Sequence, residues 1–62
     1  MTTDALAERM LALLAARPRT FYALLRELPD AEYRQILRAW GALRERRALA
    51  RDDEGRYLPR SV

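Results

Sequence analysis

The sequence predicts a mostly α-helical fold in which three helices are followed by a small β-hairpin, all within a single domain of residues 1–62. Two observations carry this prediction. Apolar residues recur at helical spacing in three successive segments, and prolines and capping residues separate these segments. After the third segment, two short strand-compatible runs flank a polar loop that ends in glycine, which is typical of a hairpin.

The first helix is expected over residues 4–16, where Thr2 or Thr3 can cap its start. Its apolar residues fall at i, i+4, i+7 and i+8 and form one face: Leu6, Met10, Leu13 and Leu14. Pro18 disfavours helical geometry at the residue before it, so the helix should end shortly before that point. Leu11 lies outside the main stripe and widens the apolar surface, which could form a homodimer or cover the hairpin.

The second helix is short and is expected over residues 21–28, between a capping Thr20 and a terminating Pro29. Asp30 then follows at once and should cap a third helix over residues 31–46. The buried face of this third helix is expected to consist of Tyr33, Ile36, Leu37, Trp40 and Leu43.

Gly41 lies in the middle of the third helix, where glycine costs about 1 kcal/mol relative to alanine. The simplest explanation is a close crossing by the first helix. The hairpin is expected over about residues 48–59, with Gly55 closing its loop. Because alanine is a poor strand former, a three-helix bundle with a disordered tail is the alternative for this part of the chain.

The residue inventory argues against catalysis. Cysteine, histidine and lysine are absent, and the one serine, Ser61, lies next to the end of the chain. Thiol nucleophiles, the histidine base and the thiolate and imidazole metal ligands are therefore missing. Carboxylates remain, but Asp52, Asp53 and Glu54 are consecutive beside a glycine, which indicates a solvated turn rather than a spaced acid pair. Gly41 and Gly55 stand too far apart for a phosphate-cradling loop. We expect a protein that is not an enzyme and has no cofactor, metal site or small-molecule substrate.

Charge instead favours an anionic partner. All 12 basic residues are arginine against 9 acidic residues, which gives a net charge of +3 and a pI of about 10.2. The planar arginine fork suits phosphates and guanine edges. The longest apolar run, from Met10 to Ala16, is too short to span a membrane, and Asp4 and Glu8 lie where a signal peptide would be basic. A cytoplasmic protein with no membrane partner is expected.

In this order, the elements resemble the winged helix-turn-helix family. The resemblance is carried by Arg17-Pro18-Arg19-Thr20, Leu28-Pro29-Asp30, Ile36-Leu37-Arg38-Ala39-Trp40, Arg46-Arg47-Ala48-Leu49-Ala50-Arg51-Asp52 and Glu54-Gly55-Arg56-Tyr57. It implies that the third helix lies in the DNA major groove. Many members have a glycine where this helix meets the wing, whereas this chain has Arg47 followed by Ala48, so a strained or rearranged junction is expected there.

The resemblance also implies which residues contact double-stranded DNA. On the outward face of the third helix, small Ala31 and Ala42 would allow close approach, and Asp30 could relieve the charge of Arg34. Eight residues are expected to form the DNA contacts: Arg34, Gln35 and Arg38 at base edges, Arg19, Thr20 and Tyr22 at a backbone phosphate, Arg46 near the helix end and Arg56 beside the wing.

The predicted function is therefore that of a small DNA-binding transcriptional regulator, with a homodimer through the first helix as a plausible assembly. The acidic loop Asp52-Asp53-Glu54 should be held away from phosphates by repulsion. The alternative is a winged-helix adaptor that binds a protein rather than DNA, through this acidic loop and the flank around Leu11.

Overall fold

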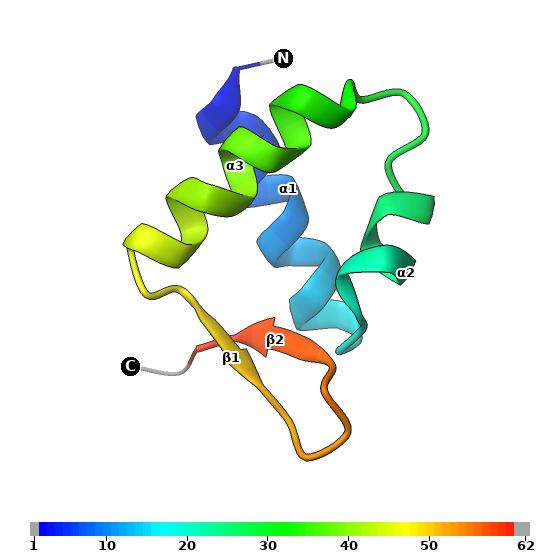
Figure 1. Ribbon diagram of the computed structural model, residues 1–62, viewed down its shortest axis with the longest axis vertical. Helices are drawn as coiled ribbons and strands as arrows, with labels where there is room; N and C mark the ends of the chain where they lie inside the picture. Colours follow the sequence, from blue (N-terminus) through cyan, green and yellow to red (C-terminus); the bar gives the residue numbers. More distant parts are fainter. Residues whose placement is uncertain (1, 61–62) are drawn as a thin grey trace.

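The computed structural model describes residues 2–60. It contains three helices, α1 (Thr3–Ala16), α2 (Phe21–Arg26) and α3 (Tyr33–Glu45), followed by the strands β1 (Leu49–Arg51) and β2 (Tyr57–Pro59). The fold is thus mostly α with a small antiparallel hairpin, as the sequence predicts (Figure 1). Ser61 lies outside the described residues, so the expectation that it is not a catalytic nucleophile stays a prediction.

Both predicted threonine caps are confirmed. The Thr2 hydroxyl accepts a hydrogen bond from the backbone N–H of Ala5, and the Thr20 hydroxyl accepts one from the N–H of Ala23, each at 3.1 Å. Each bond satisfies one of the free N–H groups at a helix start. Arg17, directly before Pro18, adopts an extended backbone and ends α1 where the sequence predicts.

The bounds of α2 and α3 differ from the prediction. Helix α2 ends two residues early because the N–H groups of Glu27 and Leu28 turn back to the carbonyls of Leu24 and Leu25 in a tighter turn. The prediction that Asp30 caps the third helix is wrong, because Glu32 occupies the cap position without any side-chain hydrogen bond. The Asp30 carboxylate lies instead 3.3 Å from Arg9 on α1.

The hairpin pairs Leu49 with Pro59 and Arg51 with Tyr57. Gly55 adopts φ 81° in the connecting turn, a conformation that suits glycine. Arg19, in the loop between α1 and α2, adds an unpredicted isolated bridge: its N–H and carbonyl exchange hydrogen bonds with Tyr57 at 3.1 and 2.7 Å. The α1–α2 loop is therefore fastened to the hairpin.

The core lies around α1, which passes between α3 and α2 and reaches the hairpin at its far end (Figure 1). The ten buried hydrophobic residues are Leu6, Ala7, Met10, Leu14, Leu24, Leu28, Ile36, Ala39, Trp40 and Leu43. The Trp40 ring joins three elements, since it contacts Phe21 of α2 at a ring-centroid distance of 4.7 Å and Tyr57 of β2 at 4.8 Å. Leu11 is half-buried against this core.

Candidate nucleic-acid interface

The buried face of α3 is rotated from the one predicted. Ala39 is fully buried, whereas the expected core residues Tyr33 and Leu37 are 58% and 45% exposed. Two overlapping sets of apolar residues on this helix could form the buried face. One contains Tyr33 and Leu37, and the other contains Ala39. Because Ala39 is small, α1 can approach closely on its side, and the set containing it becomes the inner face. The exposed side of α3, which carries Arg34, Leu37, Arg38 and Gly41 and which we call the outer face, is consequently more apolar than expected.

The predicted base-reading residues lie on or beside this outer face. Arg34 and Arg38 are exposed, and neither has a carboxylate within ion-pair distance among residues 2–60. The expectation that Asp30 relieves Arg34 is wrong, because Asp30 pairs with Arg9. Gln35 is half-buried at the edge of the face, and Ala31 and Ala42 are also half-buried rather than open to a partner.

Gly41 lies in the middle of the outer face. A Cβ atom built on it would meet no atom within 4 Å, so the predicted close crossing by the first helix is wrong. At 100° per residue, Gly41 lies about 20° from Arg34 around the helix, on the side toward Leu37, and one turn beyond Leu37. The backbone of α3 therefore has open space beside it at this point of the outer face.

The three residues predicted at the start of the second helix have different surroundings. The Arg19 guanidinium donates to the carbonyls of Arg17 and Leu13 at 3.1 Å and lies 3.5 Å from Glu27, so it links the end of α1 to α2. Thr20 forms the cap described above. Tyr22 is 73% exposed, so its ring lies outside the core.

The two remaining predicted contacts are already paired with carboxylates. Arg46 lies 3.7 Å from Glu8 of α1 across a solvent-exposed pair. Arg56 lies 2.9 Å from both Asp52 and Glu54, so the hairpin loop neutralises its own flanking cation. The DNA-contacting roles of all eight residues stay predictions, but these pairs make Arg46 and Arg56 weaker candidates than Arg34 and Arg38.

The Asp52 carboxylate organises this loop. One of its oxygens accepts hydrogen bonds from the N–H groups of Glu54 at 2.9 Å and Arg56 at 2.8 Å. The bond from the Arg56 N–H, supported by the Arg56 guanidinium, holds the pKa of Asp52 below its ordinary value. Similarly, the hydrogen bond from Arg9 lowers the pKa of Asp30.

Unpaired arginines gather in three places. Four of the 12 arginines form ion pairs, and the other eight have no carboxylate within ion-pair distance in the described part of the chain. Two lie on the outer face of α3. A second pair, Arg17 and Arg26, lines a hollow that also contains Arg19, Thr20 and Arg56, which we call the loop hollow. It thus brings together three of the predicted contacts, without Tyr22.

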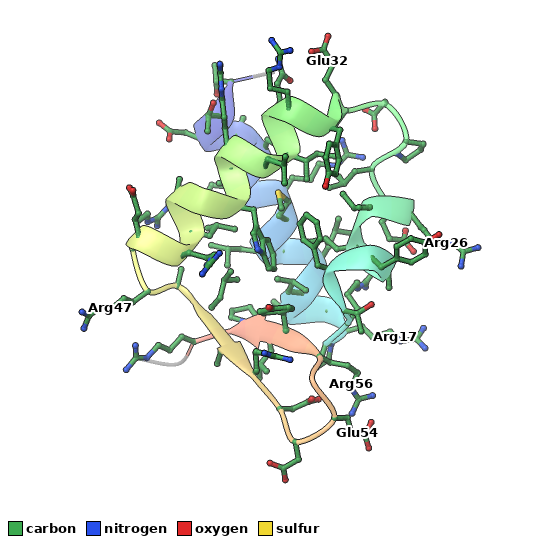
Figure 2. All side chains as sticks on the ribbon, viewed as in Figure 1. Arg17, Arg26, Glu32, Arg47, Glu54 and Arg56 are labelled. Atoms are coloured by element: carbon green, nitrogen blue, oxygen red, sulfur yellow. The ribbon has the colours of Figure 1, made fainter. Side chains whose placement is uncertain are left out.

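The third group lies where α3 joins the hairpin. Arg44, Arg47, Arg51 and Arg60 line a second hollow together with Leu49, Ala50 and Tyr57. We call it the junction hollow. In Figure 2, Arg47 lies on the opposite side of the molecule from Arg17, Arg26 and Arg56. Sequence reasoning did not identify this group, because its members come together only once the hairpin register and the turn after α3 are known.

Comparisons with protein-family models, curated proteins and solved structures found no match. No helix in residues 2–60 has the length and apolar character needed to cross a membrane. The candidate interface therefore stands on its geometry and charge.

Proposed function

We propose that this protein binds double-stranded DNA through the outer face of α3. The observation that carries the proposal is the state of Arg34 and Arg38, which lie one turn apart on the exposed side of a helix whose other side is buried in the core. Neither side chain is held by a carboxylate of the described residues. A firmly packed helix with free guanidinium groups suits the major groove, which is wide enough to admit an α-helix.

The layout supports the same proposal. Helix α2, a tight turn and α3 follow one another as in a helix-turn-helix, and the hairpin after α3 is compatible with a wing. In such a domain the second of the two helices enters the groove. Arg34 and Arg38 would then contact guanine edges or phosphates, and the exposed Leu37 could contact thymine methyl groups. The cellular role that we propose is transcriptional regulation.

Fluorescence anisotropy on a labelled duplex, measured across a salt series, tests this function. The wild type should bind with an affinity that falls steeply as salt rises, because phosphate contacts release counterions. The double variant Arg34→Gln/Arg38→Gln should bind much more weakly. If both residues contact phosphates, the slope of log K against log salt should fall by about two.

A variant of equal charge serves as the control. Arg9→Gln/Ala12→Glu lowers the net charge by the same two units on the exposed side of α1, away from the outer face of α3. This variant should retain most of the affinity. Absence of any salt-dependent binding by the wild type would overturn the proposal. An equal loss in both variants would show that net charge alone attracts the DNA.

A protein partner is the second candidate, and a specific observation favours it. Tyr22, Tyr33 and Leu37 are the large apolar side chains exposed in residues 2–60, and none of them lies on α1. We infer that a protein partner would bind at α3, where Tyr33 and Leu37 are exposed, rather than at Leu11, which packs against the core. Self-association through this surface should appear in light scattering as a concentration-dependent mass that Leu37→Gln reduces.

A further inference from the structure

We propose that the junction hollow is a binding site for closely spaced phosphate groups. Among residues 2–60, four arginines line it, Arg44, Arg47, Arg51 and Arg60, and no acidic residue does. Its volume of about 430 Å³ falls within the roughly 300–1,000 Å³ of ordinary small-ligand sites. Arginine forks suit phosphate oxygens because they donate two parallel hydrogen bonds to one group.

The charges of the hollow lack compensation within the described chain. None of its four arginines forms an ion pair with a residue in 2–60, although Arg9, Arg19, Arg46 and Arg56 all do. Where their guanidinium groups approach within the Debye length of about 8 Å at physiological salt, they repel one another. A ligand with two or more phosphates would remove this repulsion, whereas a single weakly charged anion would remove only part of it.

Arg47 provides an independent indication that these side chains serve a ligand. It is the single non-glycine residue with positive φ in residues 2–60, at 55°. The N–H of Arg47 donates to the carbonyl of Arg44 at 3.1 Å, and the N–H of Ala48 donates to that of Leu43 at 2.9 Å. These two bonds form a Schellman turn, whose left-handed position favours glycine. An arginine there adds strain to the fold and contributes a guanidinium to the hollow.

The other side chains are brought to the hollow by the hairpin. The Arg51 guanidinium lies over the Tyr57 ring, 5.3 Å from its centroid, so its edge stays available to donate hydrogen bonds. The N–H of Arg60 donates to the carbonyl of Ala48 at 2.8 Å, which fixes the Arg60 backbone beside the turn that carries Arg47. Backbone hydrogen bonds of the hairpin and the turn therefore help to place these residues around the hollow.

Two sources could supply such phosphates: a free oligophosphate, or successive phosphates of a nucleic-acid strand. Inorganic tripolyphosphate is the probe for the first source, and it requires nothing of the proposed function. The labelled duplex described above is the probe for the second, and that arm rests on the proposed function.

The test compares two variants that remove the same charge. Arg44→Gln/Arg47→Gly removes two guanidinium groups of the hollow and relieves the strain at position 47, so its loss of binding cannot be ascribed to unfolding. Arg34→Gln/Arg38→Gln removes two from the outer face of α3. Calorimetry and amide chemical shifts of the full chain would be recorded against tripolyphosphate at constant ionic strength, with sulfate as the reference anion.

Tripolyphosphate should bind the wild type more tightly than sulfate does, with shifts centred on residues 44–60. The hollow variant should lose about tenfold or more in affinity, whereas the α3 variant should stay within about twofold. If tripolyphosphate does not bind but the hollow variant lowers the duplex salt slope by about two, the phosphates come from a nucleic-acid strand. Equal weakening of tripolyphosphate binding in both variants, or no effect of the hollow variant on either probe, overturns the proposal.

Discussion

Arg47 illustrates how one residue can lower stability while providing a charge. At φ 55° it occupies a position where a side chain costs roughly 1–2 kcal/mol relative to ordinary helical geometry. Glycine would avoid that cost but would lose more entropy on folding. We therefore expect Arg47→Gly to stabilise the protein by about 0.5–1 kcal/mol, which for a domain of this size raises Tm by a few degrees.

Thermal unfolding followed by circular dichroism checks this prediction, with Arg47→Ala as the matched control. Alanine removes the same charge but keeps the Cβ atom that the left-handed conformation disfavours. A gain in Tm for the alanine variant as large as that for glycine would show that charge repulsion, rather than backbone strain, limits stability at this position.

Asp52 predicts how the hairpin loop responds to acid. Its folded-state pKa lies below the ordinary value of 3.8, chiefly because the Arg56 N–H donates to the carboxylate. The stabilisation is therefore fully present above about pH 3.8 and is lost as the pH falls through the lower folded-state pKa. Carboxyl NMR titration should report the lowered pKa, and the loop amides of Glu54 and Arg56 should shift over the same pH range. An Asp52 midpoint at or above 3.8 would contradict the hydrogen-bonded geometry.

At the scale of elements, Gly41 weakens α3 without serving its packing. Nothing lies within 4 Å of a Cβ added there, so Gly41→Ala should stabilise the protein by about 1 kcal/mol through helix propensity alone. Gly55→Ala is the opposite case, since φ is 81° and the new Cβ would lie 3.4 Å from Arg51. Urea unfolding of both variants should give changes of opposite sign, and a destabilised Gly41→Ala would reveal a contact that the structure does not contain.

Gly41 also bears on the proposed function. Its bare backbone lies at the centre of the outer face of α3, where a bulky side chain would separate the helix from a groove. Gly41→Leu should therefore preserve the fold and weaken duplex binding by at least about tenfold in the anisotropy assay. Unchanged affinity in a folded Gly41→Leu variant would place the DNA contact elsewhere.

The order and type of the elements could be predicted because their signals are local. Threonine caps, Pro18 and the spacing of leucines act within a few residues, and Gly55 marks the hairpin turn. The rotation of α3 could not be read in the same way, since two sets of apolar residues overlap and only contact with α1 selects the one that contains Ala39. Asp30 failed as a cap because Arg9, distant in sequence, attracts its carboxylate.

The candidate site residues, likewise, could be predicted only where local signals place them. Arg34 and Arg38 could be predicted as outward-facing because they lie opposite Trp40 and Leu43 on any helical projection. The junction hollow could not, because it depends on the left-handed turn at Arg47 and on a hairpin register that places Arg60 beside Ala48. The pairing of Arg56 with Asp52 and Glu54 likewise follows from the turn geometry rather than from the order of charges.

At the scale of the whole molecule, the positions of both candidate surfaces depend on one side chain. Trp40 is buried between Phe21 of α2 and Tyr57 of β2, and Tyr57 in turn supports Arg51 of the junction hollow. A domain of this length has a stability of about 3–9 kcal/mol in total. Replacing a buried tryptophan with alanine costs roughly 3–5 kcal/mol, which is comparable with that total.

We therefore expect Trp40→Ala to be largely unfolded at 37 °C, whereas Trp40→Phe should fold with a lower Tm because the ring contact with Tyr57 is partly kept. Circular dichroism gives the helix content, and near-ultraviolet spectra report the packing of the remaining aromatic rings. A cooperative, native-like melt of Trp40→Ala would mean that α1 alone organises the three helices. The hairpin would then have to be held by its backbone bridge to Arg19, and the geometry of the junction hollow would not depend on the core.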